Sequence, residues 1–165
     1  NTINKLRKNY DLIIYTGPID KFFKNKFGKL TWRSLIFKFK NFKKEFKQPV
    51  GQVNYPNQFN YTRSVEYKYI TKQKKKSTSI SYEYPISEGD PYYPVNTKED
   101  ESKYKKYLKA SKNYEKDNIY FVGRLAQYTY INTDEAIDIA LKLYKKLDRR
   151  FNFDFWHIFK INEII

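Results

Sequence analysis

The chain has 165 residues, a formal net charge of +15, 19% aromatic residues and no cysteine. This length corresponds to about one domain, and the lack of cysteine excludes disulfides, thiolate catalysis and cysteine-based metal sites. The aromatic content excludes a disordered chain. The sequence has no run of about 18 apolar residues, the length needed for a helix to span a membrane. Only six of the 33 basic residues are arginines. We therefore attribute the charge to solvent-facing lysines and expect no nucleic-acid partner.

The first 28 residues predict a strand followed by a short helix. Residues 1–9 are polar and basic, typical of a helix end or a connector. Residues 10–15 predict a buried strand, which the turn residues 16–18 close. Residues 19–27 place three phenylalanines on one helical face, and Gly28 predicts the end of that helix.

After Gly28 the hydrophobic pattern changes to a period of two. Residues 29–38 alternate in a way that predicts an antiparallel strand covered in part on both faces. Further strands are predicted at 51–55, 64–71 and 77–84, and the charged run 72–76 predicts a hairpin tip. Together these segments predict an antiparallel sheet.

The last third of the chain predicts a helix, then a strand, a glycine-bearing loop and a second helix. Residues 100–113 and 136–144 have apolar side chains at helical spacing, and residues 119–122 predict a buried strand. In open α/β sheets, ligands collect at the carboxyl ends of strands, where helix N-termini present N–H groups to anions. The stretch 123–134, with Arg124 and two tyrosines, therefore predicts a site for a phosphate-bearing ligand.

This order of elements predicts a mixed α/β (α+β) fold in which an antiparallel sheet interrupts an α/β layer. We expect residues 1–28 and 98–150 to form the layer and residues 29–97 to form the inserted sheet domain. Residues 151–165 are an aromatic tail that we expect to dock on the layer or on a partner. The tail holds the single histidine, His157, which has no metal ligand at useful spacing, so no metal site is predicted.

Eight motifs occur in one order along the chain: YTGPID at 15–20, WRSL at 32–35, VNYP at 53–56, YTR at 61–63, EYK at 66–68, EYP at 83–85, PYYP at 91–94 and GRLA at 123–126. In this order, across about residues 10–146, they closely resemble the C-terminal half of UDP-galactopyranose mutase. The resemblance implies a flavoenzyme that interconverts UDP-galactopyranose and UDP-galactofuranose through a reduced-flavin N5–sugar adduct. It also implies FAD as cofactor, a Rossmann-like FAD-binding layer, and a role in glycan biosynthesis.

The resemblance also implies roles for individual residues. Arg63 and Arg124 would be catalytic and face the flavin and the substrate diphosphate. The substrate would be bound by Tyr92, Tyr93, Tyr130 and Asn54, and the cofactor by Gly123, Arg124, Asn132, Thr133 and Asp134. Which of Tyr92 and Tyr93 faces the ligand stays open, because successive residues of an extended segment face opposite sides. Thr133 and Tyr67 depart from the methionine and histidine that are usual in the family.

Arg63, Glu66 and Glu83 also have alternative interpretations that do not involve this site. Arg63 could be a sheet-surface arginine paired with Glu66, although the flanking motif favours a site. Glu66 and Glu83 could form the carboxylate pair of a hydrolase, but solvated or salt-bridged strand residues are the favoured interpretation.

The family's Gly-rich dinucleotide fingerprint has no counterpart in this chain, since no G-x-G-x-x-G is present. We expect an N-terminal FAD-binding half, either upstream in the same polypeptide or lost, and we expect this segment to be inactive by itself. The alternative is a truncated, inactive homologue that acts as a basic binding or structural module. A cytoplasmic location is predicted, and a homo-oligomer is compatible with the sequence.

Overall fold

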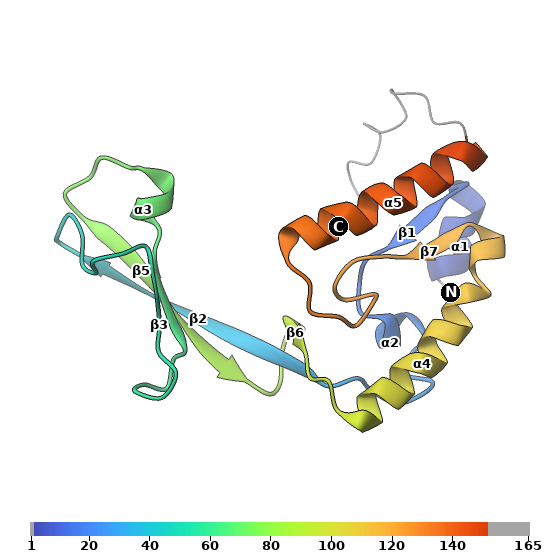
Figure 1. Cartoon of the computed structure of the whole chain (residues 1–165), viewed down its shortest axis with the longest axis horizontal. Helices are drawn as coiled ribbons and strands as arrows, with labels where there is room; N and C mark the ends of the chain where they lie inside the picture. The colour runs from blue at the N-terminus through green and yellow to red at the C-terminus, as the bar shows by residue number, and fades with distance from the viewer. Residues whose placement is uncertain (1, 152–165) are drawn as a thin grey trace. The chain divides into compact units, whose positions relative to one another are not determined.

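The structure is a computed structural model, and it describes residues 2–151. The chain divides into two compact units, which are treated separately below. Unit 1 comprises Asn1–Leu30 and Lys98–Ile165, and unit 2 comprises Thr31–Thr97. Both contain helices and strands, so the predicted mixed α/β class is confirmed (Figure 1). None of the helices within residues 2–151 has the length and apolar character needed to cross a membrane.

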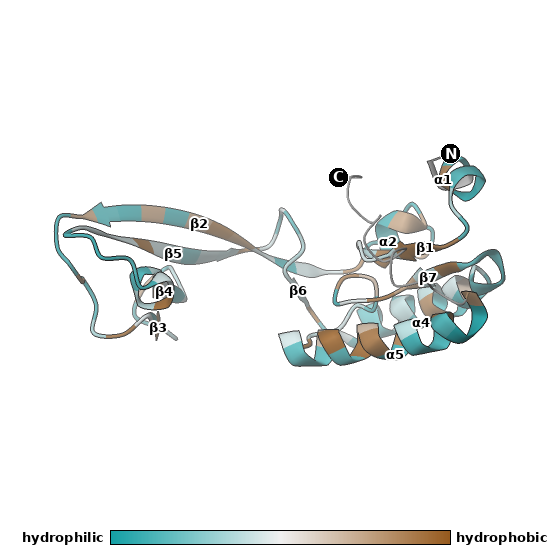
Figure 2. Cartoon of the chain, turned by 90° about the horizontal axis from the view of Figure 1, so that it is seen from above, coloured by the Kyte–Doolittle hydropathy of each residue, from teal (hydrophilic) through white to brown (hydrophobic). Residues whose placement is uncertain are grey.

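Unit 1 is a two-stranded parallel sheet packed against helices. In chain order it contains α1 (Thr2–Asn9), β1 (Ile13–Tyr15), α2 (Ile19–Phe22), α4 (Lys98–Lys112), the 3₁₀ helix η1 (Glu115–Asp117), β7 (Ile119–Phe121) and α5 (Thr133–Phe151). β1 and β7 are parallel, with Ile13 opposite Ile119. Figure 2 shows α4 and α5 on one side of this pair and α1 on the other. Its large buried apolar side chains include Ile19, Tyr107, Ile119 and Leu147.

The helices of unit 1 follow from local sequence. The first turn of α4 carries three acidic residues after Lys98, and its last turn carries two lysines, which suits the dipole of a helix. α5 packs one apolar edge, ending at the buried Leu147, against the unit. The helices predicted at 100–113 and 136–144 and the strand predicted at 119–122 are confirmed.

Two predictions for unit 1 are wrong in part. The strand predicted at 10–15 is confined to β1, and it is not fully buried, because Ile14 is 45% exposed. The helix predicted at 19–27 ends at Phe22, since Lys24 and Asn25 adopt left-handed φ angles of 52° and 57°. Left-handed residues cannot continue a right-handed helix.

Unit 2 is a five-stranded antiparallel sheet with the strand order β3-β4-β5-β2-β6. In chain order it contains β2 (Trp32–Phe42), β3 (Gln52–Asn54), β4 (Arg63–Glu66), α3 (Lys68–Thr71), β5 (Thr78–Ile86) and β6 (Tyr93–Pro94). The longest pairing joins β2 to β5, from Ser34 opposite Ile86 to Phe42 opposite Thr78. The predicted antiparallel sheet is confirmed. Apolar and polar residues alternate along these segments because successive side chains of a strand point to opposite faces of the sheet.

Two strand predictions for unit 2 need correction in their bounds. The strand predicted at 64–71 stops at Glu66, and the chain turns into α3, where the buried Lys68 ammonium donates to the carbonyl of Glu45. β2 continues to Phe42, past the predicted end at residue 38, and this added end is largely exposed, with Phe39 64% exposed. β6 was not predicted as a strand. The tail at 151–165, including His157, lies outside the described residues except for its first member.

Candidate functional site

One row of side chains crosses four strands of unit 2. Asn54 of β3 lies opposite Arg63 of β4, Arg63 lies opposite Glu83 of β5, and Glu83 lies opposite Phe37 of β2. Residues directly opposite one another project from the same face of a sheet. The structure therefore brings the predicted residues Arg63 and Asn54 together, and adds Glu83 and Phe37 beside them.

The Arg63 guanidinium is held by both of its neighbours. Its Nε donates to Asn54 Oδ1 at 3.2 Å, and its Nη1 lies 3.5 Å from Glu83 Oε2. The Arg63 side chain is 37% exposed, whereas that of Glu83 is 11% exposed. A guanidinium has five N–H donors, so these two contacts leave donors that can bind an incoming anion.

Aromatic side chains flank this row. The ring of Tyr92 lies 5.8 Å from that of Phe37, and the ring of Phe39 is stacked 6.3 Å from that of Tyr67. The Tyr67 hydroxyl lies 3.0 Å from the Ser81 hydroxyl, so Tyr67 is fixed over the sheet. Half-exposed aromatic surfaces next to a cation provide both apolar and electrostatic contacts for a ligand.

The two tyrosines between prolines have different neighbours. Tyr92 packs on Phe37 and donates its amide to the carbonyl of Arg33. Tyr93 lies in β6 directly opposite Arg33. Arg33 and Phe37 are both odd-numbered residues of β2 and so project to one side of the strand. Either tyrosine can therefore reach that side, and their predicted roles stay predictions.

The pairing of Arg63 with Glu66 is wrong, because Glu66 is fully buried and has other partners. Its carboxylate accepts the amides of Lys47 and Gln48 at 2.9 to 3.2 Å. Burial raises the pKa of Glu66, but the Thr78 hydroxyl, these two amides and the Lys68 ammonium lower it, and the lowering prevails. Glu66 is a structural carboxylate.

The carboxylate pair of a hydrolase is also wrong. Glu83 lies opposite Arg63, whereas Glu66 lies opposite Ile80, three residues further along both strands. An odd number of residues separates the two positions, so their side chains leave the sheet on opposite faces. Glu83 is the salt-bridged strand residue that was the favoured interpretation.

In unit 1 the predicted strand, loop and helix are present as β7, residues 122–132 and α5. Gly123 has a φ of +92°, which L side chains rarely adopt, and a Cβ built on it would meet nothing within 4 Å. Its amide donates to Gln127 Oε1 at 3.1 Å. Arg124 donates to the carbonyl of Ile131 at 2.5 Å, and its guanidinium lies 5.3 Å from the centre of the Tyr130 ring. The loop thus brings Arg124 and Tyr130 together.

The start of α5 is less suited to anions than the sequence predicted. The Asn132 amide donates to Glu135 Oε2 at 2.7 Å, and the first turn also carries Asp134. These carboxylates already complement the positive end of the helix dipole. Asn132, Thr133 and Asp134 are exposed. Arg124 is the cationic side chain of this loop, and its predicted role stays a prediction.

Two of the hollows in the described part of unit 1 are compared with the predicted site. The smaller, about 110 Å³, is lined by Ala126 and Gln127 of the loop. The larger, about 640 Å³, is lined by three phenylalanines of residues 22–27 and by cations that include Arg7 and Lys24, with no predicted site residue among them.

The sequence profile of one family, described as UDP-galactopyranose mutase, matches residues 1–130. The chain belongs to the UDP-galactopyranose mutase family. It is 39% identical over 144 residues to a UDP-galactopyranose mutase of Mycoplasma genitalium, covering 82% of this chain and 35% of the relative. It is 33% identical over 141 residues to a probable UDP-galactopyranose mutase of Klebsiella pneumoniae, covering 82% and 36%. It is 34% identical over 140 residues to a dTDP-fucopyranose mutase of Escherichia coli, covering 82% and 37%.

This member of the UDP-galactopyranose mutase family spans about a third of the length of the curated relatives it matches. The geometry places two residues beside the predicted Arg63 and Asn54 that the sequence did not predict for the site. Glu83 belongs to the EYP motif, but the sequence favours a solvated or salt-bridged strand residue at this position. Phe37 lay in a recognised strand, and only the register shows that it faces Arg63.

Proposed function

We propose that the chain is the C-terminal part of a mutase that interconverts UDP-galactopyranose and UDP-galactofuranose. Residues 1–28 and 98–150 contribute to the FAD-binding layer, and residues 29–97 form the substrate domain. The observation that carries the proposal is Arg63 fixed between Asn54 and Glu83, with N–H donors left for a ligand. Family membership supports the proposed class of reaction.

The proposed reaction mainly requires cations and phenol hydroxyl donors from the protein, because its leaving group is a diphosphate. When the bond between the anomeric carbon and UDP breaks, the diphosphate leaves with the electron pair and its negative charge increases. Arg63 and Arg124 stabilise that charge, and the hydroxyls of Tyr92, Tyr93 and Tyr130 donate to the diphosphate oxygens. Glu83 and Asn54 orient Arg63 before the substrate arrives, which reduces the cost of ordering it in the transition state.

The loop at residues 122–132, which contains Gly123 and Arg124, is suited to contact one edge of a cofactor. The open side of Gly123 allows close approach of a ligand, and Arg124 supplies a positive charge there. We assign FAD contacts to Gly123, Arg124, Asn132, Thr133 and Asp134. Reduced FAD, when bound, supplies the nucleophile for the anomeric carbon, and the chain orients the substrate for it.

A further part of the protein would complete the cofactor site. The exposed Ile14, Ile137 and Leu141 of unit 1 provide apolar surface for an N-terminal FAD-binding half to cover. The same proposal includes a cytoplasmic location, which cell fractionation tests, and a homo-oligomer, which light scattering tests.

Substitution of Arg63 tests the function. In the dithionite-reduced protein that contains the upstream segment, we expect Arg63→Ala to lower kcat about 10- to 150-fold, because charge-assisted hydrogen bonds contribute about 1.5–3 kcal/mol. Arg149→Ala, an exposed arginine of α5, is the matched control and should leave kcat unchanged. Unchanged turnover in Arg63→Ala would refute the role of Arg63.

Two other readings have distinct outcomes. The relative named dTDP-fucopyranose mutase makes a dTDP-linked sugar the second candidate substrate, and the ratio of kcat/KM for the two nucleotide sugars separates the two. A truncated, inactive module predicts a colourless protein with no exchange activity. Flavin absorbance of the purified protein distinguishes this from the enzyme.

A further inference from the structure

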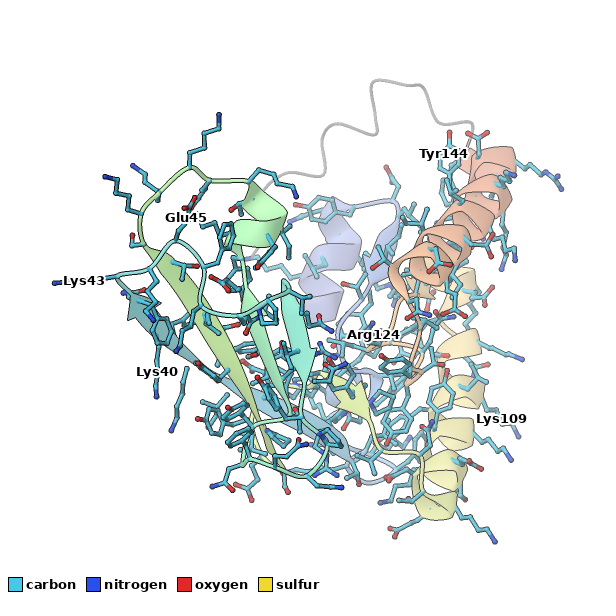
Figure 3. The ribbon with its side chains drawn as sticks, turned by 60° about the vertical axis from the view of Figure 1, so that its left-hand side comes forward. Lys40, Lys43, Glu45, Lys109, Arg124 and Tyr144 are labelled. Carbon is cyan, nitrogen blue, oxygen red and sulfur yellow. The ribbon has the colours of Figure 1, made fainter. Side chains whose placement is uncertain are left out.

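The end of unit 2 where β2 finishes and β5 begins carries a dense group of lysines. Phe42 of β2 lies opposite Thr78 of β5, so the segments 43–51 and 68–77 meet there. We call these two segments the lysine tip. Their exposed charged residues are Lys43, Lys44, Glu45, Lys47, Lys72, Lys74, Lys75 and Lys76. Figure 3 shows Lys43 at the end of this unit, directed away from the sheet.

Buried contacts hold the two segments of the lysine tip together. The Lys68 ammonium donates to the carbonyl of Glu45 at 2.9 Å and to the carbonyl of Lys75. The carboxylate of Glu66, at the end of β4 just before the second segment, accepts the amides of Lys47 and Gln48 of the first segment. Because these contacts fix both segments, the lysines form one cationic surface rather than two independent loops.

Apolar side chains are exposed within this cationic surface. Ile70 is 70% exposed, Val50 is 50% exposed and Phe46 is 44% exposed. The Phe46 ring packs 4.7 Å from that of Tyr69, and the Lys68 ammonium lies 4.9 Å from its centre. These contacts support Phe46 from beneath while leaving an edge in solvent. Several exposed apolar residues in one part of a surface, among charges, make it a candidate contact surface for a partner.

We propose that the lysine tip docks on an anionic membrane surface. The lysines would approach the lipid phosphates, and Ile70, Val50 and Phe46 would enter the interfacial layer. Lysines near an anionic leaflet each contribute to binding, and apolar side chains strengthen it by burial in the acyl boundary.

The same residues fit a nucleic acid less well. A phosphate backbone would attract the lysines equally, but it would leave Ile70 and Val50 in water, and the lysine tip contains no arginine for base or phosphate recognition. The aliphatic residues are therefore the observation that favours a lipid surface.

Flotation of the purified chain with vesicles tests the proposal. At low salt we expect binding to phosphatidylcholine vesicles with about one third phosphatidylserine and none to phosphatidylcholine alone. Changing Lys72, Lys74, Lys75 and Lys76 to Gln should weaken binding on the order of 10²- to 10³-fold. The matched control changes Lys105, Lys106, Lys109 and Lys112 of α4 to Gln, with the same loss of charge. Equal weakening by both variants would show that net charge alone is responsible and would overturn the proposal.

A second pair of variants separates lipid from other polyanions. Ile70→Ser should weaken vesicle binding roughly tenfold, whereas Ile137→Ser, an exposed position of α5, should not. The emission of Ile70→Trp should move to shorter wavelength with the phosphatidylserine vesicles. The membrane proposal would fail if the Trp emission did not shift and if Ile70→Ser left vesicle binding unchanged. The lysines would then be assigned to a polyanion such as single-stranded DNA.

Discussion

Arg63 and Glu83 form a cross-strand ion pair, with Nη1 3.5 Å from Oε2, on the sheet face that also carries Asn54. The arginine is more than a third exposed, so solvent screens the pair. We therefore assign the pair an orienting role and only a modest contribution to stability.

A double-mutant cycle measures this contribution. For Arg63→Met and Glu83→Gln we expect a coupling free energy of about 0.5–1 kcal/mol in urea unfolding. The exposed pair of Asp138 and Lys142, 2.7 Å apart on α5, is the reference, with an expected coupling of about 0.3–0.5 kcal/mol. A coupling above about 3 kcal/mol would indicate a desolvated pair and contradict the screening argument.

Glu66 makes the stability of unit 2 depend on pH. Its pKa in the folded protein lies below the ordinary value of 4.5. A carboxylate with a lowered pKa stabilises the fold above the pKa of the unfolded chain, and this stabilisation is lost as the pH falls through the folded value. We expect the free energy of unfolding to fall below about pH 4.5, and Glu66→Gln to remove part of this slope.

At neutral pH, Glu66→Gln should cost about 1–3 kcal/mol, because an amide cannot accept the two backbone N–H groups as well as a carboxylate does. The control is Glu88→Gln, an exposed residue outside the helices and strands, which should be neutral. Equal pH slopes in wild type and Glu66→Gln would contradict the assignment.

Tyr107 supports the turn after α2 through its hydroxyl. The side chain is fully buried, and the hydroxyl donates to the carbonyl of Gly28 at 2.8 Å and accepts the amide of Phe27 at 3.1 Å. Tyr107→Phe leaves both backbone groups without a partner and should cost about 1–3 kcal/mol. Thermal or urea unfolding measures this cost, with Tyr10→Phe at an exposed position as control. A neutral Tyr107→Phe would mean that water replaces the hydroxyl.

Gly123 is required for its backbone angle rather than for space. With φ at +92° and nothing within 4 Å of a built Cβ, Gly123→Ala should cost about 1–2 kcal/mol without any clash. Gly28→Ala is the comparison, because its φ is +96° and its nearest neighbour is the flexible Lys103 chain. Similar losses of stability would agree with a backbone cause. A loss confined to Gly28→Ala would point to crowding instead.

The sequence predicted the presence of most helices and strands better than the residues at which they begin and end. Alternation of side chains identified β2 and β5, since a period of two is a local property. α3 was missed because its formation depends on contacts distant in sequence, namely Lys68 with Glu45 and Tyr67 with Ser81. Propensity along the chain carries no record of such partners.

The sequence by itself determined the family, the mixed α/β class and the choice of Arg63 and Arg124 as candidate site residues. Motifs and hydrophobic periodicity are properties of short stretches of the chain, so they can be identified without the structure. Only the tertiary structure decided which residues share a face. Strand register placed Arg63 against Glu83 instead of Glu66, and the meeting of two distant loops turned scattered lysines into one cationic surface. Register and loop contact depend on pairing between segments far apart in the chain, which no single stretch of sequence specifies.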